Sequence, residues 1–143
     1  MRGIVEAIHT SAEKHLLPEP VERVEVTMEG MIGDRYGGAG DVTLVEAEAL
    51  EALRSETGVE LSAAEVRRQV LTRGVRLNDL LGKRFWVGGV LVHGEEWCEP
   101  CSHLQSLTKP GVLRGLVHRG GLRAQVVEGG RIAVGDAVTA EGA

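Results

Sequence analysis

Residues 122–140 read LRAQVVEGGRIAVGDAVTA. Apolar side chains recur at short intervals in this stretch, and the pairs Gly129-Gly130 and Gly135-Asp136 interrupt them. Apolar runs bounded by glycine turns are typical of strands, so we predict three strands over 122–127, 131–134 and 137–140. We expect Gly135-Asp136 to form a tight turn into the last strand.

The same pattern continues toward the N-terminus. We predict strands over 2–8, 23–28, 42–45 and 70–72, a break at Pro18 and Pro20, and a hairpin of 84–87 and 90–93. A helix is predicted over 46–57, a capping box at 62–65 opens a second one, and helical turns are expected over 102–107 and 113–117. Many short strands with few helices favour a mainly β fold with short helices, arranged as a closed or nearly closed barrel. We expect residues 1–143 to form one domain.

The charge balance excludes some partners. The 143 residues carry 16 Lys and Arg against 21 Asp and Glu, a formal net charge of −5. Nucleic-acid affinity comes largely from basic side chains on phosphates, so we expect no nucleic-acid partner. The longest uncharged apolar run, 87–92, is far shorter than the ~18 residues of a membrane span, and the first residues resemble a strand more than a signal peptide. We therefore expect a soluble cytoplasmic protein with no membrane contact, of unknown oligomeric state.

The two cysteines of the chain, Cys98 and Cys101, lie in the run EEWCEPCSH at 95–103. A chain of this length folds without a disulfide or a metal, so the cysteines are available for chemistry. Four interpretations stay open on the spacing: a zinc site completed by histidines, a dithiol redox pair that lacks its usual βαβ surroundings, a thiolate that carries sulfur or ligates a soft metal, or two buried small residues.

Several arginines gather near glycines. The loop GMIGDRY at 30–36 lets backbone amides approach an anion and offers Arg35 as a bidentate donor, although a glycine-rich turn with a surface Asp–Arg pair is the alternative. The run 67–76 holds four further arginines in an acidic chain, which indicates either an anionic ligand or a solvated face. Arg119-Gly120-Gly121 is either a third anion contact or a hairpin turn. We expect His9 on the surface.

Taken together, these runs resemble the MOSC domain, which occurs at the C-terminus of molybdenum cofactor sulfurases and as small stand-alone bacterial proteins. The resemblance spans nearly the whole chain and rests on the order of six short motifs: GMIGDR at 30–35, RRQVLTRGVRLN at 67–78, GKRFWVG at 82–88, EWCEPC at 96–101, RGG at 119–121 and Gly135-Asp136. The chain departs from the family pattern at Gln69, where asparagine is usual, and near Asp41, where a basic residue is frequent.

The resemblance implies a β-barrel related to that of pyruvate kinase and a bound molybdenum cofactor, molybdopterin. It assigns catalysis and molybdenum or sulfur binding to Cys101, with Cys98 as the supporting thiol. Cofactor contacts are implied for Gly33, Asp34, Arg35, Arg67, Arg68, Arg119 and Gly120.

Two activities are compatible with the resemblance: persulfide sulfur transfer to a metal centre, or molybdenum-dependent reduction of N-hydroxylated compounds. The 143 residues do not include a pyridoxal-phosphate-dependent desulfurase domain, so we expect a cysteine desulfurase or an electron-donating reductase as partner. Whether the chain is itself an enzyme stays open. The alternative is a non-catalytic binding or scaffold barrel with a structural or zinc-binding cysteine pair.

Overall fold

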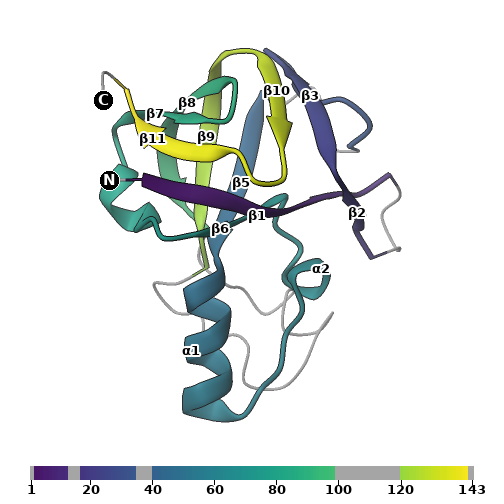
Figure 1. Cartoon of the computed structure of the whole chain (residues 1–143), viewed down its shortest axis with the longest axis vertical. Coiled ribbons are helices and arrows are strands. Elements are labelled where there is room, and N and C mark those ends of the chain that lie inside the picture. The colour runs from purple at the N-terminus through teal and green to yellow at the C-terminus, as the bar shows by residue number, and fades with distance from the viewer. Residues whose placement is uncertain (1, 13–16, 35–39, 99–119, 142–143) are drawn as a thin grey trace.

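The computed structural model describes residues 2–12, 17–34, 40–98 and 120–141, and short strands dominate it (Figure 1). The helical elements are α1 (Ala47–Thr57), α2 (Ala63–Val66) and a 3-10 turn, η1 (Leu77–Leu80). The strands are β1 (Arg2–Thr10), β2 (Glu19–Val21), β3 (Arg23–Thr27), β4 (Gly30–Met31), β5 (Asp41–Glu46), β6 (Val70–Arg73), β7 (Arg84–Val87), β8 (Val90–Trp97), β9 (Leu122–Glu128), β10 (Gly130–Ala133) and β11 (Ala137–Ala140).

Seven of these strands close into a barrel, as predicted. The larger sheet has the order β11-β7-β8-β9-β5-β6-β1-β2, and β11 also pairs with β1, which joins its two sides. In that closing pair Gly3 lies opposite Val138 in antiparallel register. Strand β2 lies outside the ring on β1, and β10, β3 and β4 form a second, three-stranded sheet.

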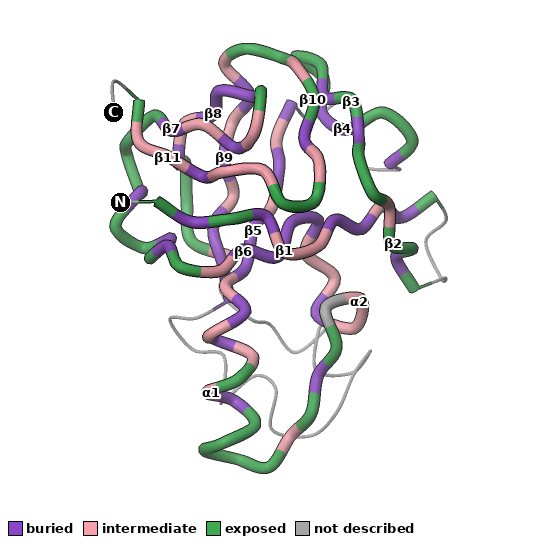
Figure 2. Tube along the Cα trace, viewed as in Figure 1, coloured by how far each residue is buried: buried purple, intermediate pink, exposed green. Residues whose placement is uncertain are grey.

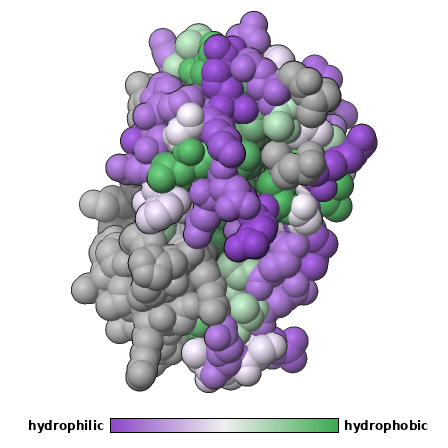
Figure 3. All heavy atoms as spheres, turned by 90° about the vertical axis from the view of Figure 1, so that its left-hand side faces the viewer, coloured by the Kyte–Doolittle hydropathy of each residue, from purple (hydrophilic) through white to green (hydrophobic). Residues whose placement is uncertain are grey.

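Alternation along the strands fills the barrel. In β9, Leu122, Ala124 and Val126 are buried, while the residues between them are half-buried. Phe85 of β7 is fully buried in the same cluster. This period-two pattern places one side of each strand in the core, and burying each large apolar side chain contributes about 1.5–3 kcal/mol. Figure 2 shows that buried residues follow the strands, and on the face seen in Figure 3 most of the coloured residues are hydrophilic, with small hydrophobic patches between them.

The helices connect the two parallel strands of the barrel. Strands β5 and β6 are parallel neighbours, which requires a crossover connection, and α1 and α2 supply it (Figure 1). Helix α1 ends where predicted, at Gly58, which adopts a left-handed φ of 76°. Helix α2 begins with the predicted capping box, in which Ser62 and Glu65 bond each other's backbone amides. A second small core, including Leu53 and Val66, packs between the two helices and the strands β5 and β6.

Most predicted strands are confirmed with shifts of one or two residues at their ends. The break expected at Pro18 and Pro20 is wrong at Pro20, which lies in β2 opposite His9. Proline fits there because β2 is an edge strand with one side unpaired. The helical turns predicted over 102–107 and 113–117 lie outside the described residues. Among the helices of the described ranges, none has the length and apolar character needed to cross a membrane.

Candidate functional site

A pocket of about 310 Å³ opens at the edge of the barrel where β6 begins. Residues of the strands β1, β5 and β9 and of the segments next to β1, β2 and β6 line it. The described lining residues are His9, Ser11, Pro18, Asp34, Asp41, Thr43, Arg67, Arg68, Gln69 and Arg123. Cationic side chains outnumber anionic ones here, with three arginines against two aspartates, in a chain whose net charge is −5.

Four lining residues form a row across the barrel wall, which we call the pocket row: His9, Gln69, Thr43 and Arg123. Strand register brings them together, because Val70 lies beside both Ile8 of β1 and Leu44 of β5, and Thr43 lies opposite Arg123 of β9. Backbone contacts extend the row one residue beyond Val70, since the amide of His9 donates to the carbonyl of Gln69 at 2.7 Å. Three of these residues lie in β1, β5 and β9, and Gln69 directly precedes β6, so the four lie at one level of the barrel.

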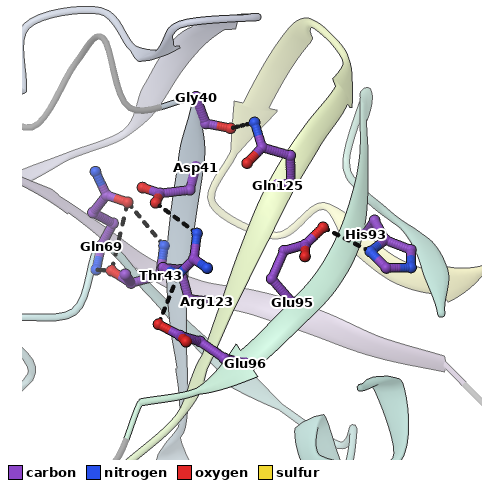
Figure 4. Close-up of polar contacts among 9 residues, drawn as sticks. All are labelled: Gly40, Asp41, Thr43, Gln69, His93, Glu95, Glu96, Arg123 and Gln125. Atoms are coloured by element: carbon purple, nitrogen blue, oxygen red, sulfur yellow. Dashed lines mark hydrogen bonds and ion pairs between the residues drawn. The ribbon is translucent and has the colours of Figure 1, made fainter. Parts of the chain in front are cut away.

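The centre of the pocket row is locked by hydrogen bonds between Gln69 and Thr43 (Figure 4). The Thr43 amide donates to Oε1 of Gln69 at 2.9 Å, and the Gln69 amide donates to Oγ1 of Thr43 at 3.0 Å. Nε2 of Gln69 donates to Oδ2 of Asp34 at 2.8 Å, and Oδ1 of Asp34 accepts from the amide of Ser11 at 2.7 Å. The two bonds of Asp34 are buried and the two between Gln69 and Thr43 are part-buried, and together they hold these pocket-lining side chains in place.

Arg68 joins the pocket to both ends of the segment that contains Cys101. Its Nε donates to the carbonyl of Gly120 at 2.8 Å, and its Nη2 donates to the carbonyl of Cys98 at 3.4 Å. The amide of Cys98 in turn donates to the carbonyl of Gly121 at 2.8 Å. The two residues that flank the cysteine-bearing segment, Cys98 and Gly120, thus both lie beside Arg68, which lines the pocket.

Arg123 forms the cationic end of the pocket row. Its Nη1 donates to Oδ2 of Asp41 at 3.1 Å, and its Nε donates to Oε1 of Glu96 at 3.0 Å (Figure 4). Hydrogen bonds to these carboxylates raise the pKa of Arg123, so the guanidinium is fully charged. Two carboxylates from β5 and β8 hold it in one orientation.

Arg67 occupies an unusual backbone conformation. It is the one non-glycine residue of the described ranges with positive φ, at φ 59° and ψ 35°. A left-handed residue with a side chain costs roughly 1–2 kcal/mol. This conformation ends α2 and turns the chain into β6, so that Arg67 and the following Arg68 both line the pocket. Local strain of this kind gathers at functional sites.

Cys98 is a free cysteine with a half-buried side chain. It lies at the end of β8, outside the βαβ unit of β5 and β6. Burial raises the pKa of its thiol, and the nearby Arg68 offsets only part of that shift. Cys98 is therefore protonated near neutral pH and is a weak nucleophile. Within the described ranges, no group of three His, Cys, Asp or Glu side chains is arranged to hold a metal ion, and His93 bonds Glu95 instead.

The structure brings together three of the predicted contact residues: Asp34, Arg67 and Arg68 all line the pocket. Gly120 is next to the pocket because its carbonyl accepts a hydrogen bond from Arg68, which lines the pocket; the bond does not involve the Gly120 amide. Gly33 is exposed and does not line the pocket. Arg35, Cys101 and Arg119 lie outside the described residues. The alternative interpretation places Asp34 and Arg35 as a pair on the surface. For Asp34 it is wrong, because this residue is only 9% exposed.

Several lining residues were missed from the sequence. His9, expected on the surface, is 7% exposed, because β1 runs to Thr10 and is covered there by β2. Arg123 and Thr43 each stand between buried neighbours in their strands, a pattern that marks half-buried positions without naming a site. Gln69 and Asp41 were visible only as departures from the family pattern. Strand pairing, which brings all of these together, is not encoded by spacing along the chain.

The fold and the pocket define a small closed β-barrel with a positively biased pocket at one edge. The chain belongs to the MOSC domain family, whose model matches residues 33–139. Members of this family typically bind the molybdenum cofactor. None of the curated proteins is significantly similar to the chain in sequence.

Solved structures show the same fold. The YUAD protein from Bacillus subtilis superposes with a TM-score of 0.84 at 16% identity, over 96% of this chain and 94% of that one. YiiM from Geobacillus stearothermophilus gives a TM-score of 0.79 at 18% identity, over 96% of this chain and 74% of that one. YiiM from Escherichia coli gives 0.77 at 17% identity, over 100% and 71%. At these identities the similarity concerns the fold alone.

Proposed function

We propose that this protein binds the molybdenum cofactor in the arginine-lined pocket and uses Cys101 as its reactive thiol. The observation that carries the proposal is the position of Arg68. The same side chain lines the pocket and bonds the carbonyls of Cys98 and Gly120, which flank the segment containing Cys101. A pocket for an anion and a cysteine-bearing segment therefore meet at one residue.

The residues present suit the cofactor. Arg67, Arg68 and Arg123 place guanidinium groups at the pocket, and guanidinium groups bind phosphate oxygens. The ring nitrogen Nδ1 of His9 is buried without a hydrogen-bond partner beside the same pocket, which leaves one polar group to be satisfied by a ligand. When bound, the cofactor supplies a molybdenum centre with sulfur ligands, and the phosphate of its pterin is the anion for the arginines.

For the chemistry at Cys101 we propose sulfur uptake. The Cys101 thiolate attacks the terminal sulfur of a persulfide on a partner cysteine desulfurase, a new S–S bond forms on Cys101, and the partner's cysteine leaves as a thiolate. No net oxidant is needed, because the transferred sulfur keeps its oxidation state. Cys98, protonated in its buried position, does not compete for the transferred sulfur.

Sulfur uptake can be measured directly. The protein is incubated with a cysteine desulfurase and free cysteine, and intact mass then shows whether one sulfur atom has been added. We expect the addition in the wild type and in Cys98→Ser, and its loss in Cys101→Ser. Equal addition in Cys101→Ser would remove Cys101 from the mechanism.

The other family activity, reduction of N-hydroxylated compounds, uses the same pocket and the same cysteine with a reductase as partner. The two activities are distinguished by what the protein needs: a persulfide donor for sulfur uptake, or an electron donor for the reduction. A protein that takes up no sulfur but reduces an N-hydroxylated compound with an electron-donating reductase carries out that reaction instead. A protein that contains one equivalent of zinc and no molybdenum is the scaffold barrel with a zinc-binding cysteine pair.

A further inference from the structure

His9 is a pocket-lining residue with unused hydrogen-bonding capacity. Its side chain is 7% exposed, and Nδ1 is buried with no partner. Buried polar atoms in folded proteins are nearly always paired, so an unpaired one in a pocket wall points to a ligand. A neutral imidazole carries one donor and one acceptor nitrogen, so Nδ1 can take part in a hydrogen bond in either tautomer.

The strand order places His9 at the far end of the pocket row from Arg123. His9 is on β1 and Arg123 is on β9, with β6 and β5 between them in the sheet. Three strand spacings separate them, roughly 14 Å along the row. The middle of the row, Gln69 and Thr43, is occupied by its own hydrogen bonds.

The two ends of the row differ in charge. Arg123 is a fixed cation, held by Asp41 and Glu96. Burial lowers the pKa of His9, so its imidazole is neutral at pH 7 and offers one donor and one acceptor nitrogen. A neutral imidazole has no charge with which to attract an anion. Its donor and acceptor nitrogens instead match a heterocycle whose edge carries both N–H donors and acceptor atoms.

We propose that His9 is a specificity residue, which hydrogen-bonds the uncharged, nitrogen-rich ring of an anionic ligand whose phosphate lies among Arg67, Arg68 and Arg123. This inference rests on the proposed function and adds to it the way in which the pocket distinguishes a pterin phosphate from a simple anion. The arginine end supplies affinity for any phosphate, and the His9 end supplies selection for the ring.

Two probes separate these contributions: inorganic phosphate, and molybdopterin released from a donor molybdoenzyme, each titrated into the purified protein. In His9→Phe, which keeps a planar ring and removes both nitrogens, we expect molybdopterin affinity to fall about three- to ten-fold, the effect of one neutral hydrogen bond. Phosphate affinity should stay unchanged. The matched control is His93→Phe, a histidine of β8 that bonds Glu95 and does not line the pocket, and it should change neither affinity.

A second measurement needs no substitution. In protein labelled with ¹⁵N at histidine, molybdopterin should shift the ring-nitrogen resonances of His9, and phosphate should leave them in place. If molybdopterin binds with unshifted His9 resonances and unchanged affinity in His9→Phe, this inference is overturned and the proposed function stands. If the wild type binds phosphate but no molybdopterin, the proposed function is overturned, and the role of His9 with it.

Discussion

Nε of Arg68 lies 2.8 Å from the carbonyl oxygen of Gly120, a residue 52 positions later in the chain. Arg68 lies two residues before β6 and Gly120 lies two residues before β9, so the bond connects the segments that lead into these two strands. Since the same guanidinium also bonds the carbonyl of Cys98, one side chain fastens both sides of the cysteine-bearing segment to the pocket wall. Arg68 therefore connects the pocket it lines to the two residues that flank the segment containing Cys101.

A substitution at Arg68 can test whether the positive charge alone is enough or whether the planar guanidinium is needed. Arg68→Lys keeps the charge but cannot donate to two carbonyls with a planar fork, so we expect a loss of about 1–2 kcal/mol in the free energy of unfolding. Chemical denaturation measures this loss. Arg54→Lys is the control, because Arg54 makes an exposed ion pair with Glu60 away from the pocket and should cost less than about 0.5 kcal/mol. Equal effects of the two substitutions would contradict the role given to Arg68.

Gln69→Leu tests the centre of the pocket row. The substitution keeps the size of the side chain but leaves the Asp34 carboxylate and the Thr43 amide without the partner that Gln69 provides. Because buried polar groups that lose a partner carry their full desolvation cost, we expect a loss of about 2–4 kcal/mol in unfolding free energy and weaker ligand binding. Gln125→Leu, which loses a single bond to the Gly40 carbonyl, should cost about 1 kcal/mol.

The glycines of the barrel differ in what they tolerate. At Gly121, φ is 106° and an added Cβ would overlap the carbonyl oxygen of Leu44, so Gly121→Ala combines backbone strain with a backbone clash. We expect it to cost about 2–5 kcal/mol. Gly135→Ala, at φ 94° with open space around it, should cost only the strain of about 1–2 kcal/mol. Thermal unfolding that ranks the two substitutions in the opposite order would show that Gly121 is not tightly packed against β5.

Stability should fall at mildly acidic pH because of His9. Burial lowers the pKa of His9 below its ordinary value of 6.5, so the unfolded chain takes up a proton that the folded protein resists. Unfolding free energy is therefore fully retained above pH 6.5 and declines as the pH falls below that value. In His9→Asn, which does not titrate, denaturation between pH 7.5 and 5.5 should show a smaller decline. An unchanged decline would assign the pH dependence to other groups.

The sequence predicts the ends of the helices well, because the residues that signal a helix end lie next to it in the chain. Gly58 ends α1 and the Ser62–Glu65 box begins α2, and both signals lie within a few residues of the structures they determine. The family motif predicts Arg67 and Arg68 as contact residues, and both line the pocket. It does not predict His9 and Arg123, because the pocket row is formed by pairing between β1, β6, β5 and β9. Each of these pairings joins residues far apart in the chain, such as Thr43 and Arg123, and periodicity along the chain carries no signal for it.

The central claim is tested by the molybdenum and pterin content of the protein purified from a host that makes the molybdenum cofactor. The wild type should contain molybdenum and pterin in equimolar amounts, Arg68→Gln should lose most of both, and Arg54→Gln should keep the wild-type content. Zinc at one equivalent with no molybdenum in the wild type, or full molybdenum and pterin in Arg68→Gln, would contradict the account.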